Sequence, residues 1–331
     1  MRPLACLFLE GGGKSRRPRA LWRLIAQFVA WQILAGVIAG FLVVFWRTAG
    51  GGGIGVSVAG YVANLPAALL SVWLAGRLLD RRPFRNFGFH LSQRWFLDLA
   101  FGLVLGAALM SGVFGTGLAL GWVKVTGTFE PLRAGRPFLV ALLPALVLFL
   151  CVGIYEETFS RGYQLRNIAE GLNLPFLGAR GAVVAAWVLS SAFFGFLHLL
   201  NPHSTAVSTA NVALAGLMLG TGYVLTGELA IPIGLHVTWN IFEGNVYGFP
   251  VSGTSPVGAV FVASRETGPE LWTGGAFGPE GGLLVTGAAL AGIALTAGWV
   301  RLRQGGIGIR GALAEKPPSV AEDGAKESGM R

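Results

Sequence analysis

Two adjacent carboxylates interrupt one of the apolar blocks of the sequence. Glu156 and Glu157 lie in the segment LVLFLCVGIYEETFSRGYQL, and Arg161 follows Glu157 by four residues. In a helix this spacing places Glu157 and Arg161 on one face, in the acid-first order that favours an ion pair. Glu156 is rotated by about 100° from its neighbour and is left free for proton transfer. The alternative is that the pair only marks the cytoplasmic end of a membrane helix.

Two histidines and an asparagine occur in later apolar blocks. His198 ends the segment WVLSSAFFGFLH, one helical turn after Phe194, so the two rings share a face. His236 and Asn240 lie four residues apart in IPIGLHVTWN and project together from a helix. Polar side chains on one intramembrane face usually point into a protein interior or a wet cavity. For His198, a purely interfacial position near a helix end stays open as the alternative.

These residue types can together hydrolyse a peptide bond. A carboxylate removes a proton from water, an imidazole positions the water or protonates the leaving amine, and an N–H group stabilises the oxyanion. No cofactor is needed for this chemistry. Two histidines and a glutamate can also hold zinc with one open position, so Glu156, His198 and His236 form an alternative metal site. The sequence has no zinc-binding helix of the H-E-x-x-H type.

Long apolar blocks surround these residues. Hydrophobic residues make up 53% of the 331 positions and charged residues 12%, about half the charged fraction of a soluble domain. Because a bilayer-spanning helix needs roughly 20 mostly apolar residues, the blocks predict eight spans, at about 25–46, 54–76, 96–122, 138–160, 180–200, 206–226, 229–248 and 281–300. The expected fold class is an all-α, polytopic membrane bundle of about eight transmembrane helices with a polar intramembrane cavity.

The basic residues predict the orientation of the chain. All but five of the 25 Lys and Arg residues fall on the side that both termini share, the exceptions being Arg47, Lys124, Arg133, Arg136 and Arg265. Under the positive-inside rule both termini are cytoplasmic. The net charge of +9 is then a topology signal and does not indicate nucleic-acid binding. The expected organisation is a basic cytoplasmic arm (1–20), a transmembrane domain (21–300) with an outer loop (249–280), and a disordered cytoplasmic tail (301–331).

The simple spans place two of the candidate residues too far apart. Glu156 lies near the cytoplasmic end of the fourth span, whereas His198 lies near the outer end of the fifth. They can meet only if the fourth helix continues past Gln164, which leaves the glutamates at mid-depth. We therefore predict a longer fourth helix that ends near Gly171.

Three motifs resemble the CPBP family of intramembrane endopeptidases, which includes the CAAX prenyl proteases and bacteriocin-processing enzymes. The family pattern is two glutamates with an arginine four residues after the second, then Phe-x-x-x-His, then His-x-x-x-Asn or Asp. Here the motifs read E-E-T-F-S-R (156–161), F-G-F-L-H (194–198) and H-V-T-W-N (236–240). The resemblance covers about residues 85–248, the expected peptidase core. The glycine-rich composition resembles that of bacterial members.

The resemblance implies a glutamic endopeptidase of the bacterial cytoplasmic membrane. Its substrate would be a membrane-associated or CAAX-like protein or a peptide, with or without a lipid. By motif position Glu156 would activate the water, assisted by His198, and His236 with Asn240 would bind the oxyanion. The supporting residues of the same motifs would be Glu157, Arg161 and Phe194.

Two other functions are compatible with the same residues. A non-enzymatic membrane protein of this fold could bind a partner or confer immunity to a bacteriocin. A proton-coupled transporter could use the intramembrane glutamates and histidines as a relay, although the sequence has no internal repeat of the kind common in transporters.

Overall fold

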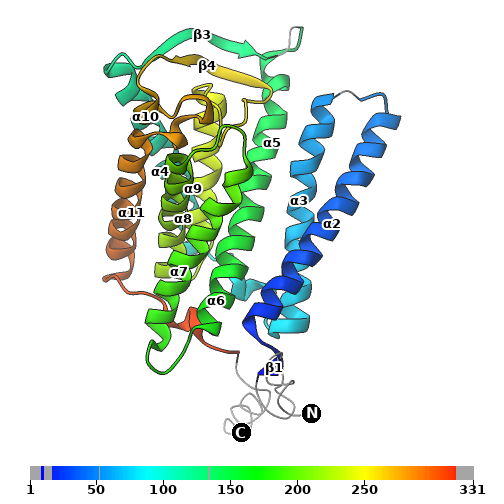
Figure 1. Cartoon of the computed structure of the whole chain (residues 1–331), viewed down its shortest axis with the longest axis vertical. Helices are drawn as coiled ribbons and strands as arrows, with labels where there is room; N and C mark the ends of the chain where they lie inside the picture. Colours follow the sequence, from blue (N-terminus) through cyan, green and yellow to red (C-terminus); the bar gives the residue numbers. More distant parts are fainter. Residues whose placement is uncertain (1–8, 11–16, 52, 133–134, 318–331) are drawn as a thin grey trace.

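The computed structural model describes residues 9–10, 17–51, 53–132 and 135–317. Its long helices run roughly parallel to one another in a bundle (Figure 1). The helices are α2 Ala20–Thr48, α3 Gly53–Ala75, α4 Gln93–Ala119, α5 Phe138–Glu157, α6 Arg166–Gly171, α7 Gly178–Leu197, α8 Ala206–Thr226, α9 Ala230–Ile241, α10 Glu270–Thr273 and α11 Leu283–Gln304. The strands are β1 Leu9–Glu10, β2 Arg17–Pro18, β3 Val123–Pro131 and β4 Ala259–Glu266.

Seven helical stretches within the described residues are long and apolar enough to cross a bilayer. They are Ala20–Thr48, Val58–Asp80, Gln93–Ala119, Phe138–Gly171, Gly178–Leu200, Ala206–Thr226 and Leu283–Gln304. The chain is therefore a polytopic helical membrane protein, as the composition predicts.

The eighth expected span, 229–248, is not among these seven stretches. Its helix α9 has 12 residues and continues only as a π-helical turn, Phe242–Val246. Gly227, at a φ of 79°, ends α8, and the N–H of the fully buried Leu229 donates to the carbonyl of Gly88. This hydrogen bond ties the start of α9 to the segment that precedes α4.

The fourth span is longer than its apolar block. Helix α5 continues through a π-helical segment, Thr158–Leu165, into α6, so the helical stretch ends at Gly171. Every residue of the π-helical segment is buried. The predicted extension of this helix past Gln164 is confirmed, and it leaves Glu156 near the middle of the stretch.

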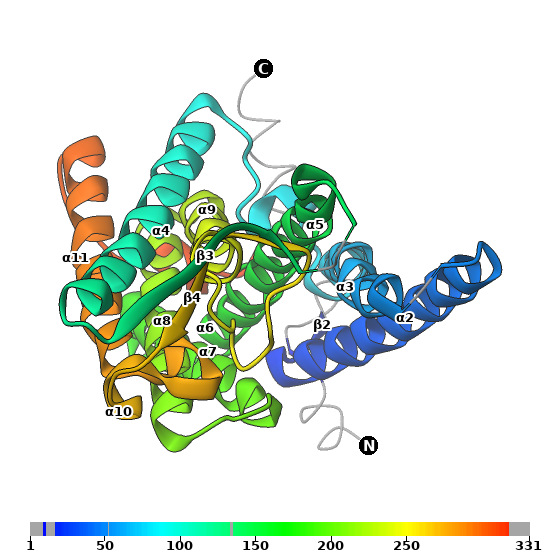
Figure 2. The ribbon, with the colours of Figure 1, turned by 90° about the horizontal axis from the view of Figure 1, so that it is seen from above.

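Helix α9 lies at the centre of the bundle, between α4, α5 and α8 (Figure 2). Glycines let α4 and α9 approach closely, as small residues do in membrane bundles. A Cβ added at Gly102 would lie 2.4 Å from the carbonyl oxygen of Ile231, and one at Gly234 would lie 2.4 Å from that of Leu99. The fixed contact with α4 holds the histidine-bearing face of α9 against α5.

A two-stranded antiparallel sheet covers the end of the bundle opposite to the start of α2 and the end of α11 (Figure 1). Strand β4 comes from the segment expected to be an outer loop, 249–280, and pairs with β3 over Val123–Pro131. The sequence analysis predicted no strand here, because the pairing joins segments that are far apart along the chain.

The opposite end of the bundle is held by buried ion pairs. The carboxylate of Glu170 in α6 accepts hydrogen bonds from Arg17, Arg23 and Arg82. The segment expected to be a disordered tail is ordered as far as it is described: Arg301–Gln304 belong to α11, and Leu313 is buried against the bundle. Its remainder, 318–331, and most of the basic arm, 1–8 and 11–16, lie outside the described residues.

Candidate active site

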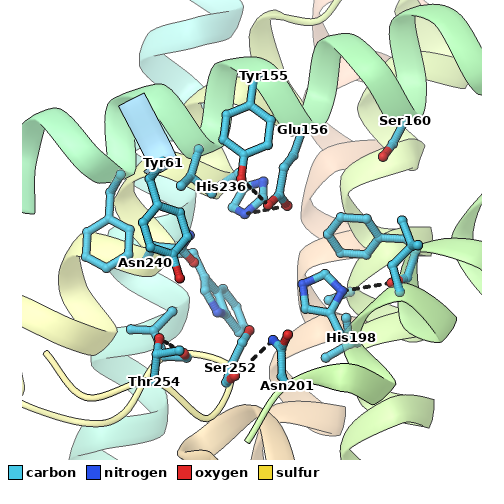
Figure 3. A pocket seen from close by; sticks show the side chains of 18 of the residues that line it. Tyr61, Tyr155, Glu156, Ser160, His198, Asn201, His236, Asn240, Ser252 and Thr254 are labelled. Carbon is cyan, nitrogen blue, oxygen red and sulfur yellow. Dashed lines mark hydrogen bonds and ion pairs between the residues drawn. The ribbon is translucent and has the colours of Figure 1, made fainter. Parts of the chain in front are cut away.

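A cavity of about 370 Å³ lies between α2, α3, α5, α7, α8 and α9. The segment that follows α9 contributes Val251, Ser252 and Thr254 to its wall. The four residues expected to be catalytic all line this one cavity: Glu156, His198, His236 and Asn240. Figure 3 shows these four side chains around it.

Glu157 points away from the cavity into the protein. Its fully buried carboxylate accepts a hydrogen bond of 2.8 Å from Arg161, four residues later on the same helix. The same Oε1 atom lies 2.8 Å from Nδ1 of His236, which therefore donates to it. The i, i+4 pairing expected from the sequence is present, and it also fixes the orientation of the imidazole.

Arg161 is held on three sides. Its second terminal nitrogen donates to the carbonyl of Gly216 in α8 at 3.1 Å, and its guanidinium lies 4.5 Å from the ring centroid of Phe194. Cation–π contacts of this kind are favourable where water is excluded. Phe194 lines the cavity and thus separates the buried Arg161 from it.

Glu156 faces the cavity, and 20% of its side-chain surface is exposed. Oε1 accepts a hydrogen bond of 3.1 Å from the Tyr155 hydroxyl. Oε2 lies 3.9 Å from Nε2 of His236, which is too long for a direct hydrogen bond. Both groups are therefore available to a water molecule and a substrate.

His198 and Asn240 complete the cavity wall. His198 donates from Nδ1 to the carbonyl of Phe194 at 2.8 Å, which leaves Nε2 of a neutral ring as a hydrogen-bond acceptor. No ion pair within 4 Å joins the two described residues Glu156 and His198, although both line the cavity. Asn240 is buried and lies one helical turn beyond His236.

Several polar residues of the cavity were missed by the sequence analysis. Asn201 follows His198 and donates to the carbonyl of Ser252. Glu280 comes from the segment between β4 and α11 and accepts hydrogen bonds from Trp239 and Ser252. A short spacing motif cannot reveal such residues, because they reach the cavity through the tertiary fold.

The described side chains do not form a metal site. No group of three or more His, Cys, Asp or Glu residues in the described ranges is arranged to hold a metal ion. Nδ1 of each cavity histidine is engaged, by Glu157 in one case and by a backbone carbonyl in the other, which leaves Nε2 of each ring as the atom available to a ligand. Glu156, His198 and His236 are not close enough to one another in this structure to form such a group.

Comparisons with known proteins agree with the motifs. Residues 138–242 match the profile of a family described as type II CAAX prenyl endopeptidase, Rce1-like, and this range contains all three motifs. The uncharacterized protein YyaK of Bacillus subtilis (strain 168) is 26% identical over 211 residues, which cover 59% of this chain and 66% of the relative. No solved structure matches significantly. Over residues 138–242 this membrane protein carries a domain of the Rce1-like type II CAAX prenyl endopeptidase family.

Proposed function

We propose that the chain is an intramembrane endopeptidase in which Glu156 activates water for peptide-bond hydrolysis. The observation that carries the proposal is that the two adjacent carboxylates have different environments. Glu157 is fully buried and bound by Arg161 and His236, whereas Glu156 faces a cavity large enough for a segment of peptide. The substrate is a membrane-associated peptide or protein.

The reaction begins with a water molecule between Glu156 and His198. Nε2 of His198 accepts one hydrogen bond from this water, and the carboxylate of Glu156 removes its other proton as the oxygen attacks the scissile carbonyl carbon. The C–N bond then breaks, and Glu156 returns the proton to the leaving amine. The products are a carboxylic acid and an amine, so no co-reactant besides water is consumed.

His236 and Asn240 bind the oxyanion of the tetrahedral intermediate. Because Nδ1 of His236 is engaged with Glu157, Nε2 can donate to the oxyanion only when the imidazole is protonated on both nitrogens. In that form Nδ1 donates to Glu157 and Nε2–H is free to donate to the oxyanion. Donors fixed before the reaction stabilise the developing charge without reorganisation.

The orientation in the membrane belongs to the same proposal. With both termini in the cytoplasm of a bacterial cell, the β3–β4 sheet lies on the outer side of the cytoplasmic membrane. The peptidase core is about 85–248, and the segment 249–280 covers the outer end of its cavity.

Cleavage of a quenched fluorogenic peptide library by the purified protein in detergent tests the activity. Glu156→Gln keeps the shape of the side chain but cannot accept the proton, so we expect the rate to fall by about 10²–10⁴-fold. Glu130→Gln, which removes an exposed carboxylate of β3, is the matched control and should cleave like the wild type.

Three outcomes would change the proposal. A Glu156→Gln variant as active as the wild type would remove Glu156 from the chemistry. Loss of activity on adding a chelator would favour a metal-dependent mechanism. Absence of cleavage by the wild type, with or without a prenyl group on the peptides, would favour the binding or immunity function.

A further inference from the structure

The cavity wall is negatively charged. Among the described residues that line it, the carboxylates are Glu156 and Glu280, and none is Lys or Arg. Arg161 is close in space, but only 2% of its side chain is exposed and both terminal nitrogens are engaged. Glu280 has the buried carboxyl of Glu243 as an electrostatic neighbour, and no Lys or Arg of the described wall pairs with it.

The carboxylate of Glu280 is fixed in place. Oε1 accepts a hydrogen bond of 3.1 Å from Nε1 of Trp239, and Oε2 accepts one from the hydroxyl of Ser252. Both carboxyl oxygens are thus held by side chains of the wall. Each oxygen keeps a further lone pair for a ligand, and Glu280 is 8% exposed, at the cavity.

The backbone that carries Glu280 is shaped by glycine. Gly278 has a φ of 93°, and a Cβ added there would lie 2.0 Å from the carbonyl oxygen of Pro250. Only glycine fits such a close approach at positive φ. The turn Pro279–Gly281 is thereby pressed against the segment after α9, so the carboxylate is built into the wall and is not a mobile surface group.

We propose that Glu280 selects substrates with a Lys or Arg side chain close to the scissile bond. The inference rests on the proposed peptidase function and names the substrate class of that site. Trp239, which holds Glu280, follows His236 by three residues, or about 4.5 Å along α9. An extended peptide advances by about 3.3 Å per residue, so the cationic residue lies one or two positions from the cleaved bond.

Matched peptides test the proposal. Each carries Lys, Gln or Glu at a single position within two residues of the cleaved bond, with both termini blocked. We expect the wild type to cleave the best-placed Lys peptide with a kcat/KM about 10- to 100-fold above that of the Gln peptide, the range of a charge-assisted hydrogen bond. Glu280→Gln should abolish this ratio, and Glu130→Gln should preserve it.

Binding to the Glu156→Gln protein separates this inference from the peptidase function. If the peptidase proposal fails but Glu280 acts as described, the Glu156→Gln variant still binds the Lys peptide more tightly than the Gln peptide. Adding Glu280→Gln to this variant then removes the difference in affinity. Equal binding of both peptides, or a Lys preference that survives Glu280→Gln, would overturn the selection by Glu280. Thermal unfolding of each variant identifies any that has failed to fold.

Discussion

The buried pair Glu157–Arg161 gives a direct measure of what holds the site together. Replacing Arg161 with Met removes the cation but keeps most of the side-chain volume. It leaves a fully buried carboxylate with His236 as its remaining charged partner. Breaking a buried ion pair on one side typically costs about 3–5 kcal/mol, and the lost contacts with Gly216 and Phe194 act in the same direction.

The double variant Glu157→Gln with Arg161→Met tests whether the cost comes from the unpaired charge. Glu157→Gln removes the carboxylate charge that Arg161→Met leaves unpaired. We therefore expect the double variant to be less destabilised than the sum of the two single variants, with a coupling energy of about 1–3 kcal/mol. Unfolding by SDS in mixed micelles, followed by the fluorescence of the ten tryptophans, measures the three free energies.

The exposed pair His90–Glu228 is the control for this cycle. The two side chains are 47% and 23% exposed, and exposed pairs contribute about 0–1 kcal/mol. Glu228→Gln should therefore change stability by no more than that. An Arg161→Met variant that loses less than about 1 kcal/mol, or single costs that simply add, would refute the account of Glu157 as a buried charge that needs its arginine.

Three further predictions concern the elements around the site. Gly102→Ala should lower stability and peptidase activity, because its Cβ would lie 2.4 Å from the carbonyl oxygen of Ile231. Gly112→Ala, on the same helix, places its Cβ in open space and should change neither. Thermal unfolding and cleavage assays compare the two variants. Glu170→Gln removes the carboxylate that Arg17, Arg23 and Arg82 share; among the described residues Arg17 keeps Glu10 and Arg23 keeps Asp80, but Arg82 keeps no acidic partner. The change should cost about 3–5 kcal/mol in SDS unfolding; a loss below about 1 kcal/mol would contradict this. Burial raises the pKa of Glu266 in β4 from 4.5 to about 7, so the protonated form is favoured on folding and hydrogen-exchange protection of β4 should increase as the pH falls from 7 to 4.5; the increase should be absent in Glu266→Gln.

Local spacing was sufficient to predict the parts of the site that lie on single helices. The i, i+4 rule predicted that Glu157 binds Arg161, and the structure shows this bond. The need to bring Glu156 and His198 to one depth predicted the helical extension to Gly171. Both predictions need only the spacing of residues in the sequence, the geometry of one helix and the thickness of a bilayer.

Contacts between distant segments could not be predicted in this way. Strands β3 and β4 are separated along the chain by helices α5 to α9, and Glu280 reaches the cavity only because Gly278 packs against Pro250. The packing of Leu313 against the bundle is another contact between segments that are far apart in the sequence. Composition classifies these segments as loop and tail, because their structure depends on surfaces that form only after the helices have packed.

The long α5–α6 stretch and the short helix α9 are related through the depth of the site. His236 must lie level with Glu156, which the α5–α6 stretch holds at mid-depth. The hydrogen bond from Leu229 to Gly88 fixes the start of α9, and its packing on α4 through Gly102 fixes the helix along its length. The start of α2 and the end of α11 lie at the same end of the bundle (Figure 1), so the chain crosses the bundle an even number of times, and α9 is the short helix among these crossings. A helix that short crosses the bundle because it lies at the centre, packed between α4, α5 and α8.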